Sequence, residues 1–286
     1  MAYVALITGA SSGIGEATAR RLARGVDGGE VSLVLLARRE ERLRALAREL
    51  GGATVLALDV TAPDAPARLR DALEREHGGQ LHLLVNNAGA AWRGAFAEIG
   101  WEGVERHMKL NFEAPARLTE ALLPLLRATA AREGPGGRRV AIVNVASTAA
   151  RVSRPNSGAY SASKFALAAW SDALHAEEAP RGVHVGLVLP GFVRTEGFPA
   201  RELPRWIVSR PERVAEAIVA AGPGGRPERY VPRPYWLAAA LRVMAPALVR
   251  RATRSGALTT ATAASQAGVT APAARAEGSG ARSATD

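Results

Sequence analysis

The sequence predicts an α/β fold in which helices cover both faces of a doubly wound parallel sheet of about seven strands. Short runs of consecutive apolar residues alternate along the chain with longer amphipathic segments, as in a series of strand–helix–strand units. The short runs are apolar throughout, which is typical of strands buried on both faces. A chain of 286 residues, 48% of them hydrophobic, is also long enough to bury the core of such a domain.

The predicted elements follow one another in regular order. Seven strands are expected, at Tyr3–Ile7, Val31–Leu36, Thr54–Leu58, Leu83–Val85, Val140–Val145, Val183–Val188 and Arg229–Val231. Six helices are expected between them, at residues 14–24, 39–50, 64–77, 101–131, 158–178 and 210–221. Each amphipathic segment is long enough to cross back over the sheet before the next parallel strand begins. The alternation therefore predicts a single domain over residues 1–233.

The C-terminal region differs in composition from this domain. Residues 234–254 combine apolar side chains with a basic end and predict a helical extension. Packing against the core or against another subunit is one interpretation of this extension, and docking on an anionic membrane surface is the other. Residues 255–286 are rich in Ala, Thr, Ser and Gly without periodicity, and they predict a disordered tail.

Composition excludes several classes of function. The chain has no cysteine, so disulfides, thiolate metal sites and cysteine nucleophiles are ruled out, and its five histidines form no ligand-like pair that would predict a metal. The net charge is +10, but the arginines are spread along amphipathic helices, so no nucleic-acid partner is expected. The N-terminus shows no basic leader followed by a long apolar run, and we expect a cytoplasmic protein.

A glycine-rich turn follows the first predicted strand. It reads Thr8-Gly9-Ala10-Ser11-Ser12-Gly13-Ile14-Gly15 and leads into the first predicted helix. Glycines allow the tight turn and let a pyrophosphate approach the backbone, where it lies at the positive end of the helix. This position between strand and helix predicts a dinucleotide site whose candidate residues are Gly9, Ser11, Ser12, Gly13, Ile14 and Gly15.

The residues after the second predicted strand indicate which dinucleotide binds. An acidic residue there would accept hydrogen bonds from the ribose hydroxyls and favour NAD. This chain has Ala37-Arg38-Arg39 instead, and Arg38 can bind a 2′-phosphate through charge-assisted hydrogen bonds. Arg39 is equally consistent with a surface charge at the start of the next helix. The prediction of NADP over NAD therefore rests on Arg38.

A tyrosine and a lysine are spaced to act together. The chain has two lysines among its 37 basic residues, and one of them, Lys164, follows Tyr160 by four positions in a predicted helix. At this spacing the two side chains share a helix face, about 6 Å apart along the axis. A fixed ammonium favours the phenolate, and an oxidised nicotinamide ring would add a second positive charge, so we expect the two cations together to lower the pKa of Tyr160 from about 10. Ser147 ends the fifth strand, at the edge where ligands of parallel sheets bind.

Together these motifs resemble the short-chain dehydrogenase/reductase (SDR) family, in its single-domain branch with the Thr-Gly-x-x-x-Gly-x-Gly and Tyr-x-x-x-Lys motifs. The resemblance covers about residues 3–235 and implies a Rossmann-type fold. It implies an NADP-dependent oxidoreductase that interconverts a ketone or aldehyde and the corresponding alcohol by hydride transfer. The catalytic tetrad would be Asn111, Ser147, Tyr160 and Lys164, with Tyr160 as general acid/base. Further cofactor contacts are implied at Asp59, Val60, Asn87, Ala88, Gly89, Tyr160, Lys164, Pro190, Gly191, Val193 and Thr195.

The resemblance also implies how these residues and the subunits are used. Lys164 would bind the nicotinamide ribose, Asn111 would position a water in a proton relay, and Thr195 with the backbone of Val193 would orient the carboxamide. Family members are often dimers or tetramers, so a homodimer or homotetramer is expected. The alternative function is a non-catalytic, dinucleotide-sensing binding protein on the same fold. Such proteins commonly lack the Tyr–Lys pair, which this chain retains.

The substrate remains open between two classes, a 3-oxoacyl thioester and a hydrophobic carbonyl compound. Aromatic side chains suggest an apolar pocket, and arginines near the same loops suggest a site for an anionic group. The aromatic candidates are Trp92, Phe96, Phe192, Phe198 and Trp206, and the arginine candidates are Arg151, Arg154, Arg194 and Arg201.

Overall fold

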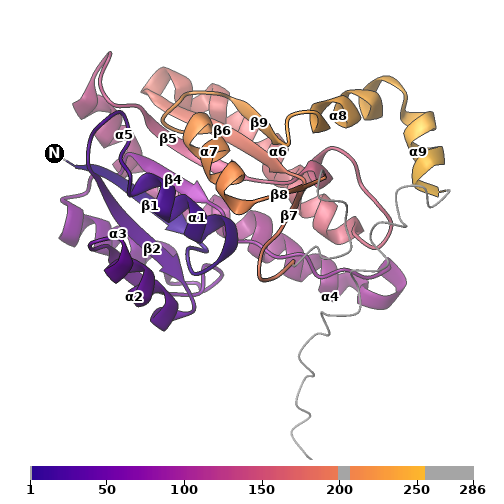
Figure 1. Cartoon of the computed structure of the whole chain (residues 1–286), viewed down its shortest axis with the longest axis horizontal. Helices are drawn as coiled ribbons and strands as arrows, with labels where there is room; N and C mark the ends of the chain where they lie inside the picture. Colours follow the sequence, from indigo (N-terminus) through magenta and orange to yellow (C-terminus); the bar gives the residue numbers. More distant parts are fainter. Residues whose placement is uncertain (1, 199–206, 255–286) are drawn as a thin grey trace, which may run out of the picture.

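The computed structural model describes residues 2–198 and 207–254 (Figure 1). The tail predicted at residues 255–286 and the candidate residues Arg201 and Trp206 lie outside these ranges. Strands β1 (Tyr3–Thr8), β2 (Val31–Ala37), β3 (Thr54–Ala57), β4 (Leu83–Asn86), β5 (Val140–Val145), β6 (Val183–Pro190) and β9 (Glu228–Val231) form the main sheet. Each boundary lies within two residues of the prediction.

All seven strands pair in parallel, in the order β3-β2-β1-β4-β5-β6-β9. The order reverses direction between β1 and β4, where a doubly wound sheet opens a crevice at the carboxyl ends of its strands. The predicted doubly wound parallel sheet is therefore confirmed. A separate ribbon pairs β7 (Phe192–Val193) with β8 (Val208–Ser209) beyond the end of β6.

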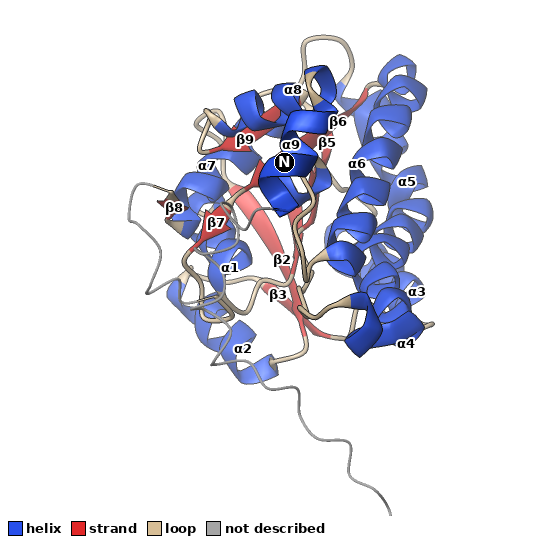
Figure 2. Cartoon of the chain, turned by 90° about the vertical axis from the view of Figure 1, so that its right-hand side faces the viewer, coloured by secondary structure: helices blue, strands red, loops and turns tan. Residues whose placement is uncertain are grey.

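Two layers of helices enclose the sheet (Figure 2). On one face lie α1 (Gly13–Leu22), α2 (Glu40–Glu49) and α7 (Pro211–Ala221), and on the other lie α3 (Ala65–His77), α5 (Ala114–Glu133) and α6 (Gly158–Glu178). Each layer has its own core, because successive side chains of a buried strand point to opposite faces. Leu35 thus packs with Leu43 of α2, whereas Leu36 packs with Leu69 of α3.

The long helix predicted at residues 101–131 is three elements. Helix α4 begins earlier, at Phe96, and ends at Met108. It is followed by a π-helical turn, η1 (Lys109–Glu113), and then by α5. Such single wide turns are uncommon inside helices and occur mostly at functional sites. This turn contains Asn111, whose side chain is fully buried.

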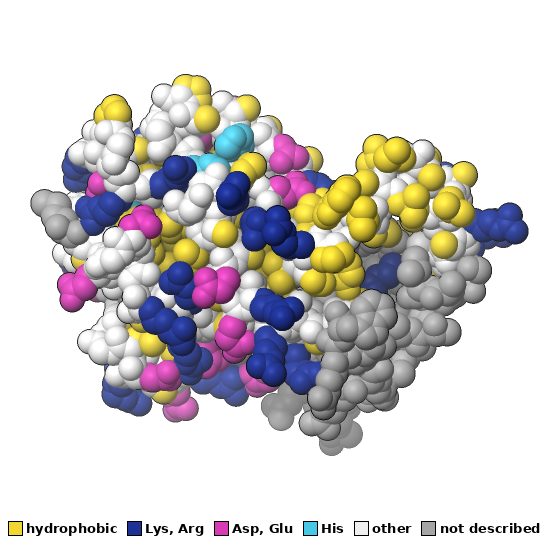
Figure 3. Space-filling view, turned by 45° about the horizontal axis from the view of Figure 1, so that its top comes forward, with side chains coloured by type: hydrophobic (Ala, Val, Ile, Leu, Met, Phe, Trp, Pro, Cys, Tyr) yellow, Lys and Arg dark blue, Asp and Glu magenta, His cyan; other side chains and the backbone are white. Residues whose placement is uncertain are grey.

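The predicted C-terminal extension is a pair of helices, α8 (Tyr235–Met244) and α9 (Pro246–Arg254), separated at Ala245. A proline cannot continue a helix from the preceding turn, because it lacks an N–H donor. The pair carries exposed apolar side chains at Trp236, Leu237, Leu241, Val243, Met244 and Leu248, which form much of the yellow surface beside these helices in Figure 3. Among the described residues, no helix is long and apolar enough to cross a membrane.

Candidate active site

The candidate residues gather at the carboxyl ends of β1, β4, β5 and β6, next to the point where the strand order reverses. Hydrogen bonds lock the ends of β1 and β4 together. The hydroxyl of Thr8 donates to the Val85 carbonyl (3.2 Å) and accepts from the amides of Asn87 (3.0 Å) and Ala88 (2.9 Å). The side-chain amide of Asn87 donates to the carbonyl of Thr8 at 2.8 Å. Asn87 thus connects the glycine-rich loop to the loop after β4.

The glycine-rich loop has the geometry of a phosphate cradle. Gly9 and Gly13 adopt φ values of 69° and 57°, which other residues rarely adopt. A Cβ on Gly15 would collide with the carbonyl of Gly9, so α1 can pack this closely on β1 only with glycine there. Ser12 precedes α1 in an extended conformation, and the first N–H groups of a helix have no intrahelical acceptor. The loop therefore fits the pyrophosphate of a dinucleotide.

The loop after β4 packs tightly against two residues of the candidate tetrad. A Cβ on Gly89 would lie 2.8 Å from Oδ1 of Asn111 and 3.3 Å from Nζ of Lys164. Asn111 in turn holds the next residue of the loop: Oδ1 accepts from the Ala90 amide, and Nδ2 donates to the Ala90 carbonyl, each at 3.0 Å. Nδ2 of Asn111 also donates to the Ser163 hydroxyl at 3.0 Å. The π-helical turn thus connects the β4 loop to α6.

Helix α6 positions the tyrosine and the lysine. Nζ of Lys164 is buried and donates to the carbonyl of Val145, the last residue of β5, at 2.8 Å. Burial lowers the pKa of Lys164 to about 8. Ser147 lies two residues after β5, where its hydroxyl accepts from the Ala149 amide (3.1 Å) and donates to the Pro190 carbonyl (3.3 Å). The structure thus brings Ser147, Tyr160 and Lys164 to one edge of the sheet, beside Asn111.

The electrostatics of Tyr160 differ from the sequence-based expectation. Burial raises the pKa of the Tyr160 phenol, and the hydroxyl of Ser147 and the charges of Arg93 and Arg154 offset this only in part. Lys164 is not among the groups that act on the phenol. The protein groups by themselves therefore raise the pKa of Tyr160, whereas the sequence predicted a lowered one. The ammonium of Lys164 donates to the Val145 carbonyl.

His107 and Ser163 support this cluster and were missed from the sequence. His107 is fully buried; its Nε2 accepts from the Trp92 amide at 3.0 Å, and its ring lies edge-on to that of Tyr160, with centroids 6.2 Å apart. The Ser163 hydroxyl donates to the Tyr160 carbonyl at 2.8 Å. A single His or Ser carries no sequence signal for such a role, which depends on contacts between distant segments.

The surroundings of Arg38 and Arg39, the two arginines after β2, also differ from those expected from the sequence. Arg38 is 79% exposed and lies 3.9 Å from Asp59. Arg39, which the sequence left ambiguous, crosses the glycine-rich loop and donates to the hydroxyls of Ser11 (3.2 Å) and Ser12 (2.6 Å). It also pairs with Glu196 at 3.1 Å. Two guanidinium groups, not one, therefore lie where a 2′-phosphate would be expected.

The remaining predicted cofactor residues border the same crevice. Val60 is buried, and Asp59 accepts hydrogen bonds from the amide (2.9 Å) and hydroxyl (2.7 Å) of Thr61. Although burial raises the pKa of Asp59, these bonds and the charge of Arg38 bring it below its usual value. The other residues lie beyond β6: Pro190 ends the strand, Gly191 packs on the Tyr235 ring, Val193 is buried in β7, and a Cβ on Gly13 would lie 3.0 Å from Cγ2 of Thr195.

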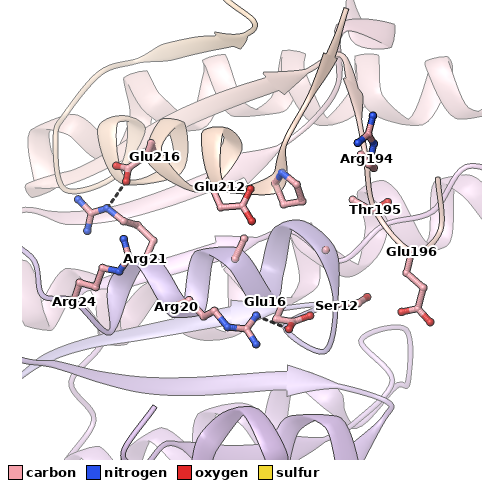
Figure 4. A pocket seen from close by; sticks show the side chains of 13 residues that line it. Ser12, Glu16, Arg20, Arg21, Arg24, Arg194, Thr195, Glu196, Glu212 and Glu216 are labelled. Atoms are coloured by element: carbon pink, nitrogen blue, oxygen red, sulfur yellow. Dashed lines mark hydrogen bonds and ion pairs between the residues drawn. The ribbon is translucent and has the colours of Figure 1, made fainter. Parts of the chain in front are cut away.

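A cavity of about 490 Å³ opens next to the glycine-rich loop, between α1 and α7 (Figure 4). Ser12, Gly13 and Thr195 line one end of it, and the charged residues Glu16, Arg20, Arg21, Arg24, Arg194, Glu196, Glu212 and Glu216 surround the rest. Arg20 pairs with Glu16, and Arg21 pairs with Glu216 at 2.8 Å. Because it lies along α1 rather than at Tyr160, we assign this cavity to the phosphate end of the crevice.

Only some of the candidate substrate residues lie together in the structure. Phe192 and Phe198 stack with their centroids 5.8 Å apart, whereas Phe96 is 70% exposed. Arg154 lies over the ring of Phe192, but Arg151 pairs with Glu228 at 3.0 Å. Trp92 packs against His107, and Arg194 lines the cavity along α1. Arg93, which the sequence did not single out, lies over Phe198.

Comparisons with known proteins agree with this architecture. The family model described as short chain dehydrogenase matches residues 3–204. The chain is 32% identical over 269 residues to dehydrogenase/reductase SDR family member 7B of Xenopus laevis, covering 86% of this chain and 79% of the relative. It is 35% identical over 195 residues to oxidoreductase UcpA of Salmonella typhimurium, covering 67% of this chain and 69% of the relative. Other 7B relatives align over only 58% to 61% of their own length.

Solved structures give the same assignment. A short chain dehydrogenase from Burkholderia cenocepacia in complex with NADP superposes with a TM-score of 0.72 at 28% identity, covering 87% of this chain and 97% of that one. The family match covers more than half of the chain, and the seven-stranded sheet has the fold of these relatives. The chain therefore belongs to the short-chain dehydrogenase/reductase family of oxidoreductases.

Proposed function

We propose that the chain is an NADP-dependent oxidoreductase that interconverts a ketone or aldehyde and the corresponding alcohol, with Tyr160 as the proton donor and acceptor. The observation that carries the proposal is the grouping of Tyr160 and Lys164 of α6 with Ser147 and Asn111, at the sheet edge beside the glycine-rich loop. When bound, the reduced nicotinamide supplies the hydride for the carbonyl carbon.

The side chains of the cluster supply the rest of the chemistry. The Ser147 hydroxyl can donate a hydrogen bond to the substrate oxygen while Tyr160 transfers its proton to that oxygen. The raised pKa of Tyr160 keeps the phenol protonated at neutral pH, which suits the reduction direction. The ammonium of Lys164, held at the Val145 carbonyl, would bind the ribose of the nicotinamide half of the cofactor. Asn111 holds the loop that follows Gly89 close to Lys164, where only a glycine fits without a shift of its neighbours.

Preference for NADP is part of the same proposal. Supporting it are two guanidinium groups after β2, Arg38 and Arg39, and the absence of a carboxylate at Ala37, where one would repel a 2′-phosphate. Arg38 is exposed, and its contact with Asp59 is long, at 3.9 Å, so a phosphate can replace that partner at small cost.

The test is NADPH oxidation, followed by its absorbance, over a panel of carbonyl compounds with wild-type protein and Tyr160→Phe. We expect turnover by the wild type and its loss in the variant, which retains the ring that packs on His107. If NADPH binds and no compound is reduced, the dinucleotide-sensing function replaces the enzymatic one.

A further inference from the structure

Two partly buried arginines near Tyr160 have no acidic partner among the described residues. Some partly buried arginines of the described residues reach carboxylates, as Arg151 does with Glu228 and Arg127 with Glu178, whereas Arg229 and Arg242 make no ion pair there. Within residues 2–198 and 207–254, neither Arg93 nor Arg154 makes an ion pair with a carboxylate. Each is partly buried, so water only partly compensates its charge.

The local structure holds both guanidinium groups in place. Arg154 lies over Phe192 (4.7 Å to the ring centroid), and Arg93 lies over Phe198 (5.3 Å). The two rings stack nearly parallel, at an interplanar angle of 18°. The amide of Gly94 donates to the carbonyl of Asn156 at 3.1 Å and so joins the loop of Arg93 to the loop of Arg154. Two loops and the β7 segment therefore form one assembly.

The assembly lies close to Tyr160, because the amide of Trp92, the residue before Arg93, donates to His107, whose ring lies edge-on to that of Tyr160. Burial lowers the pKa of Arg93, and burial together with the charge of Arg93 lowers the pKa of Arg154. Both arginines act on Tyr160, and their charges lower the pKa of its phenol. Two like charges that repel each other and are partly removed from water are stabilised by an anion that contacts both.

We propose that the carbonyl substrate carries an oxyanion, a carboxylate or a phosphate, which Arg93 and Arg154 bind on the Tyr160 side of the site. The stacked rings of Phe192 and Phe198 contact the apolar part that separates the anion from the carbonyl. This substrate class rests on the proposed function. A single substrate with an apolar part and an oxyanion accounts for both the phenylalanine rings and the arginines of these loops.

Arginine stacking alone would be a competing explanation, and Arg106 provides the comparison. Its guanidinium lies 4.0 Å from the centroid of the Trp92 ring, closer than in either of the other two contacts. Arg106 is exposed, however, and does not act on Tyr160. If stacking were the whole role of Arg93 and Arg154, removing Arg106 should have the same effect on ligand binding as removing either of them.

The test measures binding without turnover. Tyr160→Phe protein saturated with NADP⁺ is titrated calorimetrically with para-acetylbenzoate, para-acetylphenyl phosphate and the neutral methyl ester of para-acetylbenzoate. We expect at least one anion to bind about tenfold or more tightly than the ester. In the same background Arg93→Gln and Arg154→Gln should each abolish that preference, Arg154→Lys should retain part of it, and Arg106→Gln should retain it in full.

The possible outcomes separate this inference from the proposed function. Preference for one anion identifies the oxyanion as carboxylate or phosphate. Equal binding of ester and anions, or no binding of any probe, overturns the inference, even where the wild type reduces the ester. Tight anion binding with no NADPH oxidation by the wild type retains the anion site and refutes the reductase. Melting curves of the variants with NADP⁺ identify any that fail to fold.

Discussion

Two groups of arginines flank the site, and they differ in their surroundings. The outer group, Arg38, Arg39 and Arg42, has side chains 79%, 42% and 50% exposed, and each faces a carboxylate, Asp59 or Glu196. The inner group, Arg93 and Arg154, is partly buried and stacks on phenylalanine rings, and within residues 2–198 and 207–254 it has no such partner.

Burial and the nearby charged groups therefore determine which anions these arginines can bind, although the residue type is the same. Exposed ion pairs are worth little, so the outer group can exchange a carboxylate for a phosphate that arrives and leaves. A partly buried cation without a counter-charge favours an anion much more strongly, which suits selection of a substrate. The contacts of the Tyr160–Lys164 cluster are buried. We therefore expect substitutions there to lower the activity more than substitutions in either group of arginines.

The largest effect should come from that buried centre. Lys164→Met keeps the length of the side chain but removes the ammonium that donates to Val145. We expect kcat/KM for reduction to fall about 1,000-fold, as for loss of a general acid–base assembly. Lys109→Met is the matched control, because Lys109 is the second lysine of the chain and is exposed. A Lys164→Met protein that keeps a large part of wild-type activity would remove this residue from the mechanism.

Gly89→Ala tests how tightly the centre is built. Its Cβ would lie 2.8 Å from Oδ1 of Asn111, so Asn111 or the loop must shift. A displacement of this size in an active site can cost about 100-fold in rate, and we expect kcat to fall by that order. Gly158→Ala, with open space around its position at the start of α6, should be neutral. Equal steady-state kinetics for the two variants would contradict the geometry described here.

Removing a guanidinium from the outer group should affect the cofactor alone. Arg38→Ala should raise KM for NADPH about tenfold and leave KM for NADH unchanged, because the 2′-phosphate loses a charge-assisted partner. Arg39→Ala should act in the same direction. Arg44→Ala, which removes an exposed arginine paired with Glu40, is the control. Parallel changes with both cofactors would argue against a phosphate-specific role.

The activity should also depend on pH through Lys164. Its pKa of about 8 means that the ammonium is present at pH 7 and is lost as the pH rises through that value. Tyr160, with its raised pKa, remains protonated over the same interval. We therefore expect kcat/KM for reduction to be level up to pH 7 and then to decrease above about pH 8. A profile that rises through this range would show that the neutral amine is the active form.

The smallest effect should come from Glu196, which occupies Arg39 and Arg42 of the outer group. Glu196→Gln removes the carboxylate that competes with a phosphate, so KM for NADPH should fall by a factor of about two to five at low salt. The same titration with NADH should show no change. A rise in KM for NADPH would mean that Glu196 positions the arginines rather than competing for them.

Most of the fold follows from local sequence patterns. Apolar runs and turn glycines locate the seven strands of the main sheet within two residues, because each pattern reflects burial of that segment itself. The π-helical turn does not follow from periodicity, since it depends on bonds from Asn111 to Ala90 and Ser163. The extension predicted over residues 234–254 is divided into two helices at Ala245, and Pro246 begins the second one.

The site could be predicted from the sequence only in part, because some of its features depend on contacts between distant segments. Motif spacing locates Tyr160, Lys164 and the glycine-rich loop, which the structure brings to the same edge of the sheet. It does not indicate that Lys164 points to Val145, that Arg39 crosses the loop, or that Arg93 accompanies Arg154. These features arise from contacts between segments far apart in the chain.

Hydride transfer from NADPH to a carbonyl carbon can be followed with an isotope label. Wild-type protein is incubated with a reducible carbonyl compound and NADPH deuterated at the transferred position on one face of the ring or the other. We predict an alcohol that carries deuterium at the carbinol carbon with one of the two labelled cofactors and not with the other. Bound NADPH with no labelled alcohol from either cofactor would contradict the account.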